Sequence, residues 1–287
     1  MDKVVLYCKS YAPDMHRARR LAESIQRFNT DNIPLVLTVP ERDLPDFKEA
    51  FRDLACQFVT DEEVLSRTIA AHGAIPSDFE PHLLMILMKL EFWRMDLGRY
   101  YVWVDSDSYF IRPFGLSDFF HDADTPYIVQ HKLKEIRAFA HKYDRERIVA
   151  NFERESRLTQ QVFGRSGECY DFGSPPVIWS CGVLESFNRD YLEPRKQTIF
   201  DIIKQVRHDS LLYGEYLLYS GVEKAVPREQ LFKVFHYAEQ FYESQMKGEW
   251  EYSLARDYAG IIIQSNWATI QEKKRKTLAD RVKKLLG

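Results

Sequence analysis

Short apolar runs alternate with one-sided helical patterns over the first sixty residues of the chain. Three of these runs predict β-strands at residues 4–8, 33–39 and 56–59. Between them, apolar residues recur at helical spacing over 14–28 and 47–54, so each helix has one face to bury. The order β-α-β-α-β is typical of a mostly parallel sheet with helices on both faces.

The pattern continues to residue 264 without a linker-like change of composition. Residues 60–80 are polar and predict a long connection, and Pro81 and Gly98 delimit a helix over 81–97. Residues 135–163 are rich in Lys, Arg and Glu and predict one or two solvated helices. Further helices are expected at 193–205 and 209–219, and further strands at 100–104, 127–130, 176–180 with 181–183 continuing it, 231–235 and 259–264. We expect one doubly wound α/β domain over 1–271, with a helical insertion at about 135–165.

The strand at 100–104 runs directly into Asp105-Ser106-Asp107. Ligands of open α/β sheets bind just past the carboxyl ends of strands. Residues i and i+2 of an extended chain face the same way, so both carboxylates can address one site. Two carboxylates that close repel each other, and a hard divalent ion such as Mg²⁺ or Mn²⁺ shared with a diphosphate would relieve the repulsion. The alternative is a surface turn with two solvated aspartates.

Composition narrows the class of protein. Of the 287 residues, 45% are hydrophobic and 14% aromatic, which suffices for a large core, and the net charge of −3 provides no basic field for nucleic acid. The four cysteines contain no C-x-x-C pair, which disfavours a zinc site and favours reduced thiols. Residues 1–10 lack a signal-peptide pattern, and Lys89 and Glu91 interrupt the most apolar helical run. We expect a cytoplasmic protein.

The last sixteen residues differ from the rest. In 272–287, leucines and a valine share one helical face, while lysines and arginines crowd the other positions. A basic amphipathic helix can lie on anionic lipid. The tail therefore predicts either peripheral contact with the inner membrane face or a solvated helix packed on the protein body.

This order of elements, with a hydrophobic strand ending in D-x-D, resembles the GT-A-fold glycosyltransferases that use nucleotide sugars, in particular bacterial members containing the motif. The resemblance covers most of residues 1–265. It implies sugar transfer from a nucleotide diphosphate sugar to a hydroxyl acceptor, with Mn²⁺ or Mg²⁺ bridging the diphosphate. It implies that Asp105 contacts the ribose or the metal, and that Asp107 ligates the metal and is catalytic. His236, after a late strand, would be a third metal ligand, and an imidazole favours Mn²⁺. A structural histidine is the alternative.

The resemblance also assigns the loop after the first strand to the nucleoside. Lys9 and Ser10 would line it, and Tyr11 could stack on the base. Asp14 could accept a hydrogen bond from the base or simply cap the following helix. Lys89, on the helix at 81–97, could neutralise the diphosphate or lie on the wet face of that helix.

A later strand and helix would hold sugar and acceptor. Trp179, Ser180 and Gly182 resemble the strand-and-turn that contacts them, with Gly182 allowing close approach of the ligand to the backbone. A core tryptophan is the alternative for Trp179. Glu215, an acidic residue in an apolar helix, is the candidate general base if the reaction inverts the anomeric carbon. A hydrogen-bonded structural glutamate is its alternative, and retention would leave the base unassigned.

Other functions use similar motifs. A haloacid-dehalogenase-type phosphatase also has D-x-D after a hydrophobic strand, but at the first strand and followed by Thr or Val where Tyr109 stands here. Two further functions remain as alternatives: a nucleotidyltransferase that uses the same acidic pair, and an inactive nucleotide-sugar-binding module. A cytoplasmic transferase with a basic tail would suit a cell-surface polysaccharide or lipid-linked glycan as acceptor, a hypothesis that rests on 272–287 alone.

Overall fold

The fold is built around a five-stranded sheet, seen in a computed structural model that describes residues 2–265 and 267. The first four strands are parallel, and the edge strand β7 is antiparallel to β4. In spatial order the strands are β3 (Gln57–Thr60), β2 (Leu35–Val39), β1 (Asp2–Lys9), β4 (Gly98–Trp103) and β7 (Val177–Ser180).

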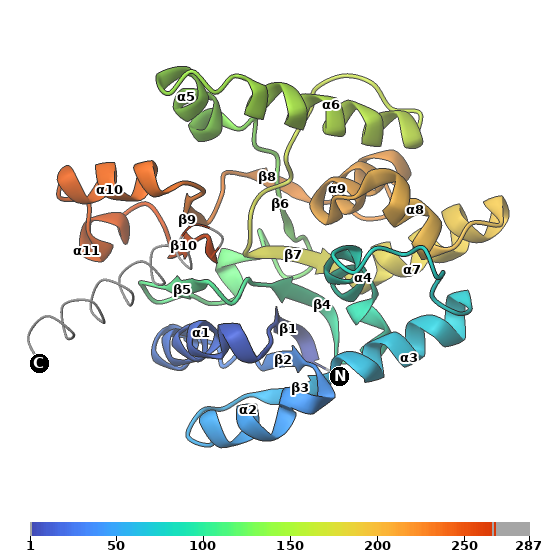
Figure 1. Ribbon diagram of the computed structural model, residues 1–287, viewed down its shortest axis with the longest axis horizontal. Coiled ribbons are helices and arrows are strands. Elements are labelled where there is room, and N and C mark those ends of the chain that lie inside the picture. Colours follow the sequence, from blue (N-terminus) through green and yellow to red (C-terminus); the bar gives the residue numbers. More distant parts are fainter. Residues whose placement is uncertain (1, 266, 268–287) are drawn as a thin grey trace, which may run out of the picture.

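Both faces of this sheet are covered, because successive strand residues point to opposite sides. Leu6 packs in the core that contains residues of the helices α1 and α2, and its neighbour Tyr7 packs in the core that contains residues of α4, α8 and α9. Figure 1 shows α8 and α9 above β4 and β7, and α1 below them. The doubly wound, mostly parallel architecture predicted from the sequence is confirmed. The helices are α1 (Met15–Phe28), α2 (Leu44–Ala50), α4 (Leu83–Glu91), α8 (Ile199–Val206) and α9 (Asp209–Ser220).

Two small sheets extend the fold past the end of β4. The strand β5 (Ser108–Phe110) follows the D-x-D directly and pairs with β10 (Gly260–Ile263), which pairs with β9 (Phe232–Phe235). The Phe110 N–H of β5 donates to Ser24 Oγ of α1 at 3.0 Å, and this bond fixes the position of β5 against that helix. The second sheet pairs β6 (Tyr127–Val129) with β8 (Val226–Arg228).

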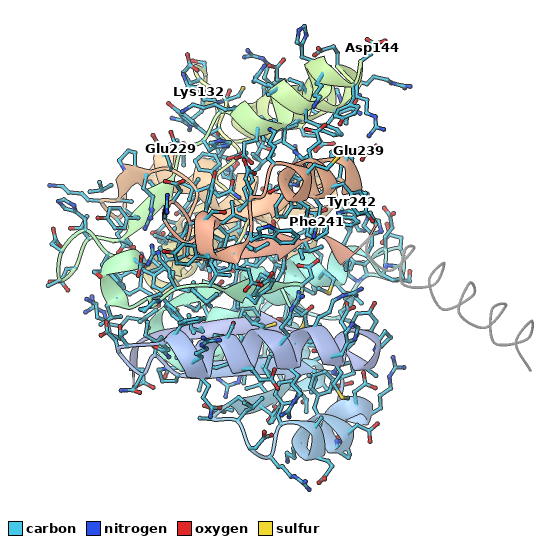
Figure 2. All side chains as sticks on the ribbon, turned by 90° about the vertical axis from the view of Figure 1, so that its left-hand side faces the viewer. Lys132, Asp144, Glu229, Glu239, Phe241 and Tyr242 are labelled. Atoms are coloured by element: carbon cyan, nitrogen blue, oxygen red, sulfur yellow. The ribbon has the colours of Figure 1, made fainter. Side chains whose placement is uncertain are left out.

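The predicted insertion contains two helices, α5 (Lys134–Lys142) and α6 (Arg147–Val162), which cross the top of Figure 1. Figure 2 shows the stretch from Lys132 to Asp144 above Glu239 and Phe241 of α10 (Ala238–Met246). The rings of Phe139 and Tyr237 stack here with centroids 4.4 Å apart. The insertion is therefore packed on the segment that follows β9. The helix α11 (Glu251–Leu254) precedes β10.

Local capping explains two of the differences from the predicted elements. The connection expected at 60–80 contains α3 (Asp61–His72), whose Thr60 and Glu63 form a capping box; the T-x-x-E pattern was present in the sequence. Residues 181–183 do not continue β7, because Ser180 caps α7 (Cys181–Ser186). The helix expected at 81–97 is α4 followed by a 3₁₀ turn over Phe92–Met95.

Two expectations concern membranes. The basic tail at 272–287 lies outside the described residues, so its membrane contact stays a prediction. Within the described residues, no helix combines the length and apolarity that a bilayer crossing requires.

Gly214 of α9 sets how closely that helix approaches the residues before β7. A Cβ there would stand 2.1 Å from Cγ of the buried Phe172 ring. We expect Gly214→Ala to lower the free energy of unfolding by about 1–3 kcal/mol, measured by urea denaturation. Gly182→Ala is the control, since its Cβ meets nothing closer than 3.6 Å. It should be neutral or stabilising by up to about 1 kcal/mol, as expected for alanine in a helix, and an equal loss in both variants would contradict this explanation.

Candidate active site

Asp105 and Asp107 occupy the turn between β4 and β5. The Ser108 N–H donates to the Asp105 carbonyl at 3.0 Å, which closes the turn. Asp105 keeps 37% of its side chain exposed, whereas Asp107 is buried. The Ser265 N–H donates to Asp107 Oδ2 at 2.8 Å, and Asp107 Oδ1 is buried without a hydrogen-bond partner. A buried carboxylate oxygen without a donor is costly unless a ligand completes it.

Neighbouring carboxylates disfavour the ionisation of both aspartates, Asp105 acting on Asp107 and Asp209 acting on Asp105. Burial raises the pKa of Asp107 to about 6, and the charge of Asp105 contributes in the same direction. Burial likewise raises the pKa of Asp105, against the lowering effect of Lys89. A cation between them would relieve both effects.

Lys89 of α4 ties the acidic pair to the helix α9. Its Nζ lies 3.7 Å from Asp105 Oδ1 and 3.1 Å from Asp209 Oδ2, and 3.6 Å above the centre of the Trp103 ring. Burial disfavours the charged amine, but Asp209 and Asp105 outweigh it and raise the pKa of Lys89. The structure therefore places Lys89 beside the D-x-D, paired with the carboxylates of Asp105 and Asp209. Its role at the diphosphate stays a prediction.

A cleft of about 630 Å³ lies beside this group; we call it the histidine cleft. Asp209 lines it, and so does Gln264, whose neighbour Ser265 contacts Asp107. The remaining walls come from the segment after β6 and the insertion, from the segments before β7 and before α9, and from the segments after β9 and after β10. They include His131, Leu133, Glu135, Ile136, Asp171, Gly173, Ser174, Pro175, His208, His236, Tyr237 and Trp267.

The predicted nucleoside loop lies at the same edge of the sheet as the D-x-D. Tyr7 of β1 pairs with Trp103 of β4, so the residues that follow these parallel strands are neighbours. Lys9 Nζ lies 2.9 Å from Asp61 Oδ2, and Ser10 Oγ is buried without a partner.

The rest of that loop is more open. Tyr11 is 44% exposed and free to stack on a planar group. Asp14 does not cap α1 through its side chain and instead pairs with Arg17. The nucleoside role of Lys9, Ser10, Tyr11 and Asp14 stays a prediction.

The predicted sugar-binding turn lies elsewhere. Because β7 is antiparallel to β4, Ser180 pairs with Tyr100 near the start of β4, whereas Asp105 follows its end. Ser180 and Gly182 line a separate cleft, and Trp179 is buried, stacked on Tyr213 with centroids 4.9 Å apart. The structure thus does not bring these three residues to the D-x-D. The antiparallel direction of β7 is the reason.

His236 and Glu215 have different surroundings. His236 lines the histidine cleft, where burial lowers its pKa to about 4. Among the described residues, no group of three His, Cys, Asp or Glu side chains is arranged to hold a metal ion. The role of His236 as a metal ligand stays a prediction. Glu215 is fully buried, with Oε2 2.7 Å from Arg165 Nε, as in its structural alternative.

Two aspartates nonetheless fit a divalent cation. Magnesium is commonly held by one or two carboxylates, with phosphate oxygens and water completing the shell. The partnerless Oδ1 of Asp107 and the raised pKa values of both carboxyl groups match that donor set. The residues that would hold the ion are therefore Asp105 and Asp107.

Sequence reasoning missed several residues of the site. Asp209 was read only as a helix start, and Trp103 only as a strand residue. His131 follows β6 as the D-x-D follows β4, and that position after a strand was the available signal. Nothing in the sequence pointed to Asp171, which a loop brings beside His131.

Comparison with known structures assigns the architecture. The chain is similar to mouse xyloside xylosyltransferase 1 in its apo form, with a TM-score of 0.51 and 10% sequence identity over 93% of this chain and 99% of that one. At that identity the likeness shows the fold, which is GT-A-like. Residues 4–255 match the model of a family of unknown function, DUF6492, and the chain belongs to that family. A search of the curated proteins finds no match.

Proposed function

We propose that this protein is a metal-dependent glycosyltransferase that moves a sugar from a nucleotide diphosphate sugar to a hydroxyl acceptor. The observation that carries the proposal is the pair Asp105 and Asp107 at the end of β4, with the buried, partnerless Oδ1 of Asp107. The GT-A-like fold supports it, because one solved structure similar to this chain is that of a xyloside xylosyltransferase.

The cation, Mn²⁺ or Mg²⁺, would be held by Asp105 and Asp107 and would stabilise the charge that develops on the leaving diphosphate. Lys89 Nζ lies 3.1 Å from Asp209 Oδ2 and 3.7 Å from Asp105 Oδ1. Asp209 thus holds Lys89, and Lys89 keeps the Asp105 carboxylate in place. Lys89 is thus a positioning residue for Asp105 and an additional positive charge at the diphosphate.

The geometry of this edge of the sheet also supports sites for the nucleoside and the acceptor. The loop after β1, from Lys9 to Asp14, would take the nucleoside, with Tyr11 as its stacking surface. The histidine cleft would take the acceptor, because it adjoins Asp209 and Gln264 and has aromatic walls such as Trp267. Aromatic faces suit sugar rings, and a glycan or lipid-linked glycan is the acceptor class we propose.

The test is to incubate the protein with UDP-, GDP-, CDP- and dTDP-sugars and MnCl₂ and to measure the nucleotide released. We expect nucleoside diphosphate release from one base class, abolished by EDTA and restored by Mn²⁺ or Mg²⁺. Pyrophosphate release would identify nucleotidyl transfer. Binding of nucleotide sugar without turnover, across water and a panel of hydroxyl acceptors, would identify a binding module.

A further inference from the structure

A histidine–aspartate pair in the histidine cleft has the geometry of an oriented proton acceptor. His131 Nδ1 lies 2.9 Å from Asp171 Oδ2 and 3.1 Å from the Leu133 amide nitrogen. The Leu133 N–H also points at Nδ1, and the two contacts are alternatives, because Nδ1 either donates or accepts. An ionised carboxylate only accepts, and its charge-assisted bond is the stronger of the two, so Nδ1 carries the ring proton that it donates to Asp171. The lone pair is then on Nε2, which has no hydrogen-bond partner within the described residues and is not among their buried partnerless atoms.

Asp171 is itself held in place. The Gly173 N–H donates to Asp171 Oδ1 at 2.9 Å, and the Asp171 N–H donates to the His131 carbonyl at 3.1 Å. Each carboxylate oxygen thus has one donor, and the two segments are joined through the backbone as well as the side chains. The imidazole is fixed in tautomer and direction by this partner, the arrangement in which a carboxylate orients a histidine base.

The backbone on both sides of the pair is strained. Leu133 has φ of 55° and Phe172 has φ of 53°, in the left-handed region that bulky residues avoid. Such conformations are unfavourable for bulky side chains and gather at functional sites. Gly173 adopts φ of 87°, and a Cβ there would stand 2.8 Å from Val129 Cβ. These positions all lie within two residues of His131 or Asp171.

We propose that His131 is the general base that accepts the proton of the acceptor hydroxyl, and that Asp171 is its positioning residue. This role of His131 rests on the proposed function, and it supplies the proton acceptor that the proposed function leaves unassigned. His131 and Asp171 line the cleft that Asp209 and Gln264 also line, on the acceptor side of the acidic pair. Glu215, fully buried against Arg165, offers no comparable access.

The step balances without any further reagent. The acceptor oxygen forms a bond to the anomeric carbon as the bond from that carbon to the diphosphate oxygen breaks, and the electron pair leaves with the diphosphate. The hydroxyl proton moves to His131 Nε2, giving an imidazolium whose charge Asp171 stabilises. Direct displacement of this kind inverts the anomeric carbon.

The pH dependence follows from the groups around the imidazole. The hydrogen bond to Asp171 is the main cause that raises the pKa of His131, and Glu229 and Glu135 act in the same direction. His236 also faces it and is neutral near pH 7, because burial lowers its pKa to about 4. A base must be unprotonated, so the rate falls as pH drops through the pKa of His131.

The experiment uses the nucleotide sugar that the wild-type protein turns over, with Mn²⁺ and water or a hydroxyl acceptor. We expect His131→Gln to lower kcat for nucleoside diphosphate release about 10²- to 10⁴-fold with the donor KM unchanged. Added imidazole should restore part of the rate to His131→Ala. His141→Gln, at a side chain 91% exposed on the same insertion, is the matched control and should match the wild type.

A rate for folded His131→Gln within about threefold of wild type, or no rescue by imidazole, overturns the role of His131. Should these variants fail to fold, the wild-type pH profile decides: it must show an acid limb, and Asp171→Asn must move that limb to lower pH. A profile without the limb also overturns the role. If the wild-type protein releases no nucleoside diphosphate from any donor, the proposed function fails. If it turns over and only Asp107→Asn abolishes the reaction, the role of His131 fails alone.

Discussion

Asp107→Asn is expected to lower metal-dependent nucleoside diphosphate release at least about 10³-fold. Metal stabilisation of a leaving group contributes several kcal/mol, and each 1.36 kcal/mol corresponds to a factor of ten in rate. Asparagine keeps the size of the side chain and one acceptor oxygen for the Ser265 N–H, 2.8 Å away in the native protein. What it removes is the negative charge, so the loss reports on the cation rather than on folding.

The measurement is single-turnover release from the preferred donor at saturating Mn²⁺, with calorimetric titration of MnCl₂ in the presence of the nucleoside diphosphate. Asp46→Asn, at an exposed position on α2, is the matched control and should change neither quantity. Asp105→Asn should weaken the metal titration as well, because Asp105 is the second carboxylate. Full metal-dependent activity of Asp107→Asn would remove the basis of the transferase proposal.

The sequence predicted the parts of this fold that depend on local pattern. Apolar runs located every strand of the central sheet, because buried strands are continuous hydrophobic segments. The capped helix α3 was missed because only Val64 and Thr68 in it are buried, which leaves no clear apolar stripe. Its signal was the capping pattern at Thr60 and Glu63, a weaker feature than periodicity.

The residues of the candidate site show the same contrast between local pattern and long-range contacts. Asp105 and Asp107 were found because strand and ligand group are adjacent in the sequence. Trp179, Ser180 and Gly182 were misplaced because the direction of β7 depends on long-range pairing that no local pattern encodes. His131 and Asp171 are forty residues apart, and the contact between them joins the segments that enter and leave the insertion. Tertiary placement, rather than residue type, limited the prediction.

The buried ion pair between Glu215 and Arg165 gives the largest expected effect on stability. Glu215 is fully buried, its Oε2 lies 2.7 Å from Arg165 Nε, and its Oε1 has no partner in the described part of the chain. Arg165→Met leaves that carboxylate without its counter-charge, and breaking a buried pair in this way costs about 3–5 kcal/mol. We expect the free energy of unfolding to fall by that amount, measured by urea denaturation at pH 7.

A double-mutant cycle separates charge from packing. Arg165→Met combined with Glu215→Leu should recover most of the loss, because replacing a whole buried pair by apolar residues is often neutral or stabilising. Glu215→Gln, which keeps a hydrogen-bond acceptor for Arg165, should leave the rate of sugar transfer per folded molecule unchanged. A 10²-fold drop in that rate with unchanged stability would instead assign the general base to Glu215, and the His131 variants would then retain activity.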